Sequence, residues 1–214
     1  MIDALVPVKH LVAAKSRLLP GPDRSAVARL TLAMLDDVLG ALSAATRVGR
    51  VAVVTPDAEV ASHARRAGAI ALLRPVPGLN PSIDAGAAEL AKAGQDGLLV
   101  VLGDVAGASA ADVDAACEAL ASLPRPSAVL CPARDGGTTA LARAPHDALP
   151  ACFGPDSAAR HREAAAARGI AFRELALPSL AIDLDRPEDV RAFLRSEHGG
   201  RHTRTVLRGL GWTS

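Results

Sequence analysis

Short apolar runs alternate with stretches of helical periodicity along almost the whole chain, and this alternation restricts the fold more than any other feature. Between the runs, apolar residues recur at three- and four-residue steps, as they do at Val27, Leu30 and Met34. Repeated strand–helix–strand units predict an α/β protein with a mostly parallel sheet and helices on both faces. The predicted strands are residues 2–8, 51–54, 70–73, 98–102, 128–131, 138–142, 170–176 and 181–184.

Helix boundaries follow from the residues placed between these strands. Asp57 and Ser109 are suited to cap helices, because their side chains can accept hydrogen bonds from the first free N–H groups. Gly68 can end a helix in a left-handed conformation. The uniformly apolar run 98–102 is expected at the centre of a parallel sheet. Further helices are predicted to start at Asp23 and Pro187 and to cover residues 82–94 and 157–168.

Length and composition favour a single globular domain. The chain has 214 residues, half of them apolar, which is enough for one sizeable core and marginal for two. We expect one domain over residues 1–198, followed by a polar, glycine-rich tail over 199–214 that is loosely held. The net charge of +1 and the aromatic content of 2% argue against a nucleic-acid partner, which usually requires a basic surface or aromatic side chains that stack on bases.

Nothing in the sequence indicates export or membrane insertion. The first residue leads directly into a predicted strand without the basic segment of a signal peptide, and no uncharged apolar stretch is long enough to span a bilayer. Cys117, Cys131 and Cys152 share no metal-ligand spacing and are interpreted as small buried hydrophobes in a reducing compartment. We therefore expect a cytoplasmic protein.

Four groups of candidate residues fall where predicted strands end. Because open α/β sheets bind ligands at the carboxyl ends of their strands, these groups are expected to lie close together. They are the cations Lys9, Lys15 and Arg17 after the first strand, Asp104 after 98–102, the turn DGGT at 135–138, and the acids Asp183 and Asp185 around the end of 181–184.

The acids are candidates for a Mg²⁺ site. Mg²⁺ prefers oxygen ligands and is usually held by one or two carboxylates together with substrate phosphates. Asp183 and Asp185 are two residues apart and would share a face of a strand, and Asp104 could complete the site from a neighbouring strand. The simpler interpretations are a helix cap for Asp183 or Asp185 and a solvated loop acid for Asp104.

Other residues are candidates for anion binding. Three cations in one loop could neutralise a polyphosphate, or could be solvated surface charge. Gly136 and Gly137 allow a tight turn that offers N–H groups to an anion, or form an ordinary hairpin turn. Ser157 is at a predicted helix start, which favours a carboxylate or phosphate, and His161 is on the same helix face. A capping residue and a surface histidine are the simpler alternative.

Five motifs stand in a characteristic order: VPVK at 6–9, AKSRL at 14–18, DGGT at 135–138, FGPDS at 153–157 with His161, and DLDRPED at 183–189. In this order, and over residues 1–194, the chain resembles the 2-phospho-L-lactate/phosphoenolpyruvate guanylyltransferase family. That family makes the activated guanylyl intermediate in the biosynthesis of the deazaflavin coenzyme F(420). The resemblance implies a three-layer, Rossmann-like nucleotidyltransferase fold with a mostly parallel mixed sheet.

The resemblance also implies roles for individual residues. The implied metal ligands, with Mg²⁺ as cofactor, are Asp104, Asp183 and Asp185. The implied substrate-binding residues are Thr138, Gly154 and Ser157 for the acceptor carboxylate and Asn80 beside the nucleotide. The implied catalytic residues are Lys9, Lys15, Arg17 and Asp104. The implied partners are GTP, a small phosphorylated three-carbon acid and the downstream transferase that takes up the unstable product.

The hypothesis is a Mg²⁺-dependent guanylyltransferase that transfers GMP from GTP to phosphoenolpyruvate or 2-phospho-L-lactate and releases pyrophosphate. Two departures from the family pattern bear on it. Asp104 is followed by Val105 and Ala106 rather than Leu-Pro, which removes a fixed φ and is expected to loosen the loop. Thr139 replaces the usual Asn and is expected to alter the substrate pocket. The alternatives are a nucleotidyltransferase for phosphoglycerate, a phosphosugar or molybdopterin, and a non-catalytic nucleotide-binding regulatory protein.

Overall fold

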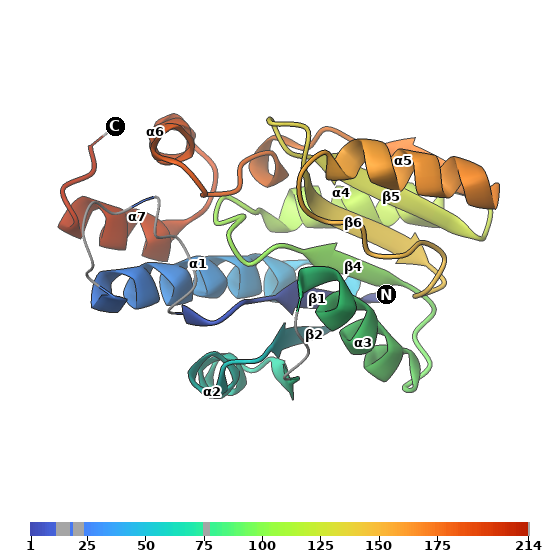
Figure 1. Ribbon diagram of the computed structural model, residues 1–214, viewed down its shortest axis with the longest axis horizontal. Coiled ribbons are helices and arrows are strands. Elements are labelled where there is room, and N and C mark those ends of the chain that lie inside the picture. The colour runs from blue at the N-terminus through green and yellow to red at the C-terminus, as the bar shows by residue number, and fades with distance from the viewer. Residues whose placement is uncertain (12–17, 19–23, 75–77, 214) are drawn as a thin grey trace.

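The computed structural model describes residues 1–11, 18, 24–74 and 78–213, and this part of the chain contains one seven-stranded sheet (Figure 1). The strands lie side by side in the order β3-β2-β1-β4-β6-β5-β7. They are β1 (Ile2–Pro7), β2 (Val48–Thr55), β3 (Ile70–Leu73), β4 (Leu98–Val101), β5 (Ser127–Pro132), β6 (Thr138–Ala144) and β7 (Ala171–Glu174). Only β6 runs antiparallel to its neighbours, β4 and β5, and the other pairings are parallel. The predicted α/β fold with a mostly parallel mixed sheet is confirmed.

Helices cover both faces of the sheet, as predicted. The described helices are α1 (Arg24–Ala44), α2 (Ala58–Arg66), α3 (Leu79–Ala91), α4 (Ala110–Ala121), α5 (Ser157–Arg168), α6 (Pro187–Arg195) and α7 (Arg201–Gly209). Side chains of α1, α2 and α4 share one core with the sheet, and those of α3 and α5 share another. None of the helices in this part of the chain is long and apolar enough to cross a membrane.

The two cores exist because side chains point alternately to the two faces of each strand. In β4, Leu99 and Val101 join the core of α1, α2 and α4, whereas Leu98 and Val100 join the core of α3 and α5. All four side chains are fully buried, which explains the uniformly apolar run. The prediction that β4 is central is confirmed, but one of its two neighbours is the antiparallel β6.

Two element predictions are wrong. Residues 181–184 form no strand, because the Leu184 N–H donates to the Asp104 carbonyl at 3.2 Å and not to a strand ladder. The apolar side chains of Ile182 and Leu184 are instead buried in a third core with α1, α6 and α7. The helix predicted from residue 82 begins at Leu79, since a proline, here Pro81, is tolerated in the first turn of a helix.

The C-terminal segment is a helix and not the loosely held arm that was expected. α7 packs along α1 (Figure 1), with Leu207 and Thr203 fully buried. The N–H groups of His202 and Thr203 donate to the carboxylate of Asp37 in α1, at 3.0 and 2.8 Å. The segment looked polar as a whole, but residues four apart, Thr203 and Leu207, supply a narrow buried face.

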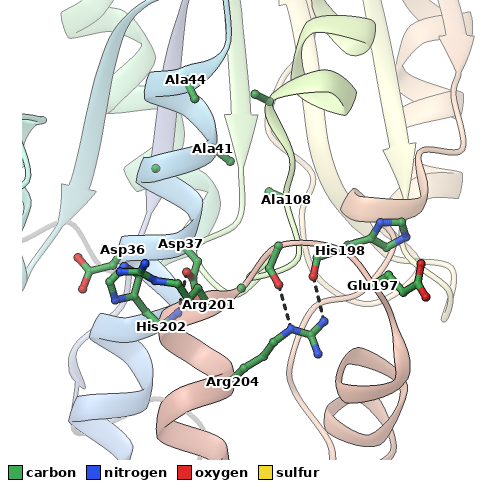
Figure 2. A pocket seen from close by; sticks show the side chains of 14 residues that line it. Asp36, Asp37, Ala41, Ala44, Ala108, Glu197, His198, Arg201, His202 and Arg204 are labelled. Carbon is green, nitrogen blue, oxygen red and sulfur yellow. Dashed lines mark hydrogen bonds between the residues drawn. The ribbon is translucent and has the colours of Figure 1, made fainter.

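Arg204 fastens α7 to the end of α6. Figure 2 shows its guanidinium turned toward the segment that joins the two helices, beside a groove against α1. The guanidinium donates to the carbonyl groups of Leu194, Ser196 and His198 at 3.1, 2.7 and 2.9 Å, and lies 4.4 Å from the centre of the Phe193 ring. It thereby satisfies carbonyl groups left free at the end of α6.

Candidate active site

Backbone hydrogen bonds join the segments that carry the predicted site residues. β6 runs opposite to β4, so the start of β6 lies at the edge where β4 ends, and the loop of Asp104 is beside Thr138. Further bonds tie the DGGT turn to the loop of Asp183 and to the start of α5. The four bonds are Leu102 N–H to Thr139 O, Leu184 N–H to Asp104 O, Arg134 N–H to Ala181 O and Ala158 N–H to Gly136 O, at 3.0, 3.2, 3.2 and 3.3 Å.

Asp104 and Asp183 form the acidic part of the candidate site. Burial raises the pKa of Asp183 to about 7, and the negative charge of Asp104 acts in the same direction, with smaller contributions from Asp185 and Asp135. The Asp104 Oδ1 atom is buried. Both residues are only partly buried, but two partly desolvated carboxylates that repel each other are still costly unless a cation neutralises them. Asp185, by contrast, is exposed to solvent.

The carboxylates of Asp104 and Asp183 suit Mg²⁺, which takes some of its ligands from the substrate, better than a metal ion that is bound by protein side chains alone. Among the described residues, no three His, Cys, Asp or Glu side chains are grouped as a metal ion would require. The three acids are therefore not assembled as a ready three-ligand cage. Asp104 and Asp183 nevertheless fit a hard cation that is held by one or two carboxylates and completed by substrate phosphates.

The loop after Asp104 is held without proline. Val105 and Ala106 are fully buried, and Val105 N–H donates to Leu102 O at 3.2 Å. Gly103 lies so close to the end of β1 that a Cβ atom there would be 3.3 Å from Pro7 O and 3.0 Å from Cγ2 of Val8, the next residue. Burial and a turn hydrogen bond thus constrain the loop where proline is absent, and the expectation that the loop is loosened stays a prediction.

Thr138, Gly154 and Ser157 surround the start of α5. Thr138 and Ser157 are 3% and 1% exposed, and Gly154 is exposed with a φ of 116°, which a residue with a side chain rarely adopts. Within the described residues, Ser157 Oγ is buried without a hydrogen-bond partner. A buried unpaired hydroxyl at a helix N-terminus is suited to an anionic ligand.

Thr139 does not share this position. Its side chain is fully buried, and its hydroxyl donates to the Cys131 carbonyl in β5 at 3.1 Å. Successive residues of a strand face opposite sides, so Thr139 points away from the side that Thr138 presents. The expectation that Thr139 alters the substrate pocket finds no support in this contact.

Asn80 holds the chain that leads to Gly154. Its Nδ2 donates to Phe153 O at 3.1 Å, and its Oδ1 accepts from Phe153 N–H at 2.8 Å. Arg160, which sequence analysis did not single out, donates to the same carbonyl at 3.1 Å. Because the backbone of Phe153 engages both ends of the Asn80 amide, Asn80 supports the loop of Gly154 from α3.

The basic part of the predicted site is only partly described. Lys9 is exposed just after β1, whereas Lys15 and Arg17 lie outside the described residues. Asp57, predicted only as a helix cap, also reaches this segment: it caps α2 and accepts the Leu11 N–H at 3.1 Å. Desolvation opposes ionisation of Asp57, but the N–H groups of Leu11, Val60 and Glu59 outweigh it and lower its pKa.

Comparison with known proteins finds similar sequences over most of the chain. The family model described as "Guanylyl transferase CofC like" matches residues 2–214. The chain is 45% identical over 190 residues to a phosphoenolpyruvate guanylyltransferase of Sphaerobacter thermophilus, covering 87% of this chain and 89% of that protein. It is 40% identical over 215 residues to a 3-phospho-D-glycerate guanylyltransferase of Phenylobacterium zucineum, covering 98% and 97%.

The fold is also found among solved structures. A Desulfovibrio desulfuricans G20 protein assigned to the nucleotide-diphospho-sugar transferases superimposes with a TM-score of 0.78 at 16% identity, covering 97% of this chain and 95% of that one. At this level of identity the likeness concerns the fold alone. It agrees with the three-layer arrangement of sheet and helices described above.

Proposed function

The chain belongs to the CofC-like guanylyl transferase family, and on that premise we propose that it transfers GMP from GTP to phosphoenolpyruvate in deazaflavin coenzyme F(420) biosynthesis. 2-Phospho-L-lactate is the alternative acid for the same pathway. The observation that carries the proposal is the acidic pair Asp104 and Asp183, which lies at the sheet edge beside Thr138 and the start of α5.

The proposed reaction needs no general base. A phosphate oxygen of the acceptor acid, which is already anionic, forms a bond to the α-phosphorus of GTP, and the bond from that phosphorus to pyrophosphate breaks. Catalysis then consists of positioning and charge neutralisation. Lys9, with Lys15 and Arg17, is proposed to bind the GTP phosphates and to neutralise the leaving pyrophosphate.

Asp104 and Asp183, with the exposed Asp185 nearby, are the residues proposed to hold Mg²⁺. A bound Mg²⁺ would neutralise negative charge on the reacting phosphates. Support for this assignment comes from the raised pKa of Asp183, since burial and the charge of Asp104 make the pair unfavourable without a cation.

Thr138, Gly154 and Ser157 are proposed to bind the carboxylate of the acceptor acid. Ser157 Oγ, buried and without a partner in the described part of the chain, is a hydrogen-bond donor for it. The free N–H groups and the dipole at the start of α5, a helix of 12 residues, add favourable electrostatic interactions with an anion.

A second candidate acceptor is 3-phospho-D-glycerate. It is favoured by the Phenylobacterium zucineum relative, which is similar over nearly the whole of both chains. This acid also combines a carboxylate with a phosphate on a three-carbon skeleton, so the residues named above would serve it as well. Neither of the two relatives compared above is named for a phosphosugar, a molybdopterin or a regulatory role.

The experiment that tests the proposal is an acceptor panel. The purified protein is incubated with GTP and Mg²⁺ and with phosphoenolpyruvate, 2-phospho-L-lactate or 3-phospho-D-glycerate, and pyrophosphate release is followed. Release with phosphoenolpyruvate, abolished by EDTA, is the expected result. Preferential release with another acid would replace the acceptor, and GTP binding without release for any acid would favour a regulatory protein.

A further inference from the structure

His161 joins the two segments that carry the proposed acceptor site. It lies on α5, one helical turn after Ser157, and its Nδ1 is 3.1 Å from Thr138 Oγ1. The backbone N–H of Cys152 donates to its Nε2 at 3.0 Å. The Phe153 ring meets the imidazole edge-on, with 5.2 Å between the ring centres. The imidazole thus connects the start of β6 with the residues just before Gly154.

The bond from Cys152 fixes which ring nitrogen carries the hydrogen. A backbone N–H can only donate, so Nε2 must accept and is unprotonated, and the neutral ring carries its hydrogen on Nδ1. The surroundings favour the neutral form, because the His161 side chain is fully buried and burial lowers its pKa to about 4. The positive charges of Arg143 and Arg160 also lower this pKa, whereas a hydrogen bond to the Ser157 backbone raises it.

This arrangement determines what the Thr138 hydroxyl can do. Because Nδ1 carries a hydrogen, it cannot accept the hydroxyl proton, and the hydroxyl oxygen accepts from the ring. In the described part of the chain, the Thr138 side chain makes no other hydrogen bond, so its proton is available to a ligand. We infer that His161 is a positioning residue that presents the Thr138 hydroxyl as a hydrogen-bond donor to the anionic group of the acceptor acid.

The inference rests on the proposed acceptor site and adds the direction of one hydrogen bond there, from the Thr138 hydroxyl to the ligand. A carboxylate oxygen only accepts hydrogen bonds, so a hydroxyl held as a donor matches it. A rotating hydroxyl could point its proton at a histidine nitrogen and offer the ligand only lone pairs. His161 excludes that orientation of the Thr138 hydroxyl before the acid binds, and this reduces the entropy lost in ordering the site on binding.

A merely structural role for His161 predicts a different pattern. In that case its only task would be to hold Cys152, as Asn80 holds the neighbouring Phe153 from α3. Asn80 makes no hydrogen bond to Thr138, so it is the matched control for a residue that only supports this loop.

Two substitutions at His161 separate the roles. The amide nitrogen of Asn can take the place of Nδ1, whereas the amide oxygen of Gln can take the place of Nε2. His161→Asn therefore keeps a donor for Thr138 and gives up the bond from Cys152, and His161→Gln does the reverse. With the thermal unfolding of both variants checked, the inference predicts that His161→Gln raises the KM of the acceptor acid about tenfold or more, as expected for a lost bond to a charged group.

The expected pattern is that His161→Asn raises this KM less than His161→Gln, and that neither changes the KM of GTP. In a Thr138→Val background, His161→Gln should have no further effect, whereas Asn80→Ala should keep its full effect. A larger defect in His161→Asn than in His161→Gln, or additive effects of His161→Gln and Thr138→Val, would overturn the inference.

The hydrogen position can be measured without any variant or activity. Nitrogen-15 NMR of the histidine ring in the wild-type protein should show the hydrogen of His161 on Nδ1. Finding it on Nε2 overturns the inference whatever the activity. A wild-type protein that releases no pyrophosphate with any of the three acids overturns the proposed function instead, so the two failures are distinguishable.

Discussion

At the scale of single residues, the site combines ionisable groups whose protonation equilibria are shifted in ways that can be measured. The pKa of Asp183 is raised to about 7 by burial and by Asp104, and the pKa of His161 is lowered to about 4 mainly by burial. Both side chains are less favourable as charged groups in the folded protein than in water. Each shift therefore makes a prediction about stability.

Replacing Asp183 by Asn is expected to stabilise the metal-free protein and to reduce turnover. The pKa of Asp183 is higher in the folded than in the unfolded protein, so the wild type loses stability as pH rises toward 7 and the carboxyl group ionises. Removing this charge should therefore raise the free energy of unfolding at pH 8, by roughly 2 kcal/mol once the partial exposure of Asp183 is allowed for. Urea unfolding in EDTA measures the change. Mg²⁺ should then stabilise the wild type more than the variant.

Asp114→Asn is a control for this substitution, because the change in stability that we expect for it has the opposite sign. Although desolvation acts against its ionisation, the N–H groups of Thr46 and Arg47 lower its pKa. Asp114→Asn should therefore lower stability and leave turnover unchanged. If Asp183→Asn lowered stability in EDTA as Asp114→Asn does, the acidic pair would not be strained by repulsion.

Acid is expected to destabilise the fold through His161. Its folded pKa is below the unfolded value of about 6.5, so the unfolded state takes up a proton first and stability falls as pH decreases from about 6.5 to 4. The loss should reach roughly 2 to 3 kcal/mol and should be smaller in His161→Gln. Urea unfolding at several pH values measures it.

Most of the candidate site residues could be named from the sequence, but their contacts could not. The order of motifs pointed to Asp104, Asp183, Thr138 and Ser157, which the structure brings to one edge of the sheet. Spacing alone left His161 open between a site residue and a surface histidine, because burial depends on packing across the sheet. The role of Asn80 as a support for Phe153 was missed, since the two are 73 residues apart.

At the scale of elements, α2 and the segment after β1 share one support. Asp57 caps α2 and also accepts the N–H of Leu11, while Asp57 N–H donates to Thr55 Oγ1 at 3.1 Å. The basic segment, which follows β1 and carries Lys9, Lys15 and Arg17 in the sequence, is thus held at Leu11 by a residue that is itself bonded to the end of β2. A helix cap therefore has consequences beyond its own helix.

Asp57→Ala is expected to weaken both the helix and GTP binding. Loss of the cap should cost about 1 kcal/mol of stability. Loss of the bond to Leu11 should raise the KM of GTP by a factor of about two to ten, as for a hydrogen bond worth 0.5–1.5 kcal/mol. Steady-state kinetics with varied GTP, alongside urea unfolding, measures both effects.

Asp114→Ala is the matched control. Asp114 also accepts backbone N–H groups from another element, those of Thr46 and Arg47 at 3.0 and 2.8 Å, but before β2 begins, at the opposite edge of the sheet. It should cost stability without changing the KM of GTP. An equal change of that KM in both variants would contradict the role given to Asp57.

Most elements could be predicted from periodicity, and the errors have physical causes. The strand predicted over 181–184 shows that an apolar run can be buried by helices without pairing in a sheet. Local sequence gives burial but not the hydrogen-bond partner, here Asp104 O for the Leu184 N–H. The helix predicted from residue 82 starts three residues earlier, at Leu79, because Pro81 fits within its first turn.

At the scale of the whole molecule, the C-terminal helix is linked to the acidic pair. Leu207 of α7 shares the third core with Ile182 and Leu184, which flank Asp183. Arg204 and Asp37 fasten the same helix to α6 and α1. The position of Asp183 therefore depends on a segment that comes last in the chain.

Leu207→Ala is expected to lower the stability by about 2 to 4 kcal/mol, since Leu207 is fully buried and the substitution leaves a cavity. Leu210→Ala, at a partly buried position of the same segment, should cost much less. Thermal and urea unfolding measure both. Turnover should fall in Leu207→Ala, because the core around Asp183 loosens. Wild-type stability in Leu207→Ala would mean that α7 is not held by this core in solution.

The arrangement of the sheet was predictable in class but not in detail. Alternating elements predict helices on both faces, and the hairpin alternative for the turn at Gly136 and Gly137 makes residues 138–144 antiparallel to the strand before them, but nothing in the sequence indicates the pairing with β4. Its direction follows from its hairpin with β5 and its pairing with β4, which are properties of the assembled sheet.

The reversed direction of β6 has a consequence for how such a protein can diverge. Because β6 begins at the edge where β4 ends, everything proposed to recognise the acceptor, from Thr138 to His161, is encoded in one continuous stretch of about two dozen codons. The acidic pair and the basic segment are encoded outside it. A lineage could therefore exchange one phosphorylated acid for another by mutation or recombination within that stretch, while the residues proposed to bind the nucleotide and Mg²⁺ are inherited unchanged.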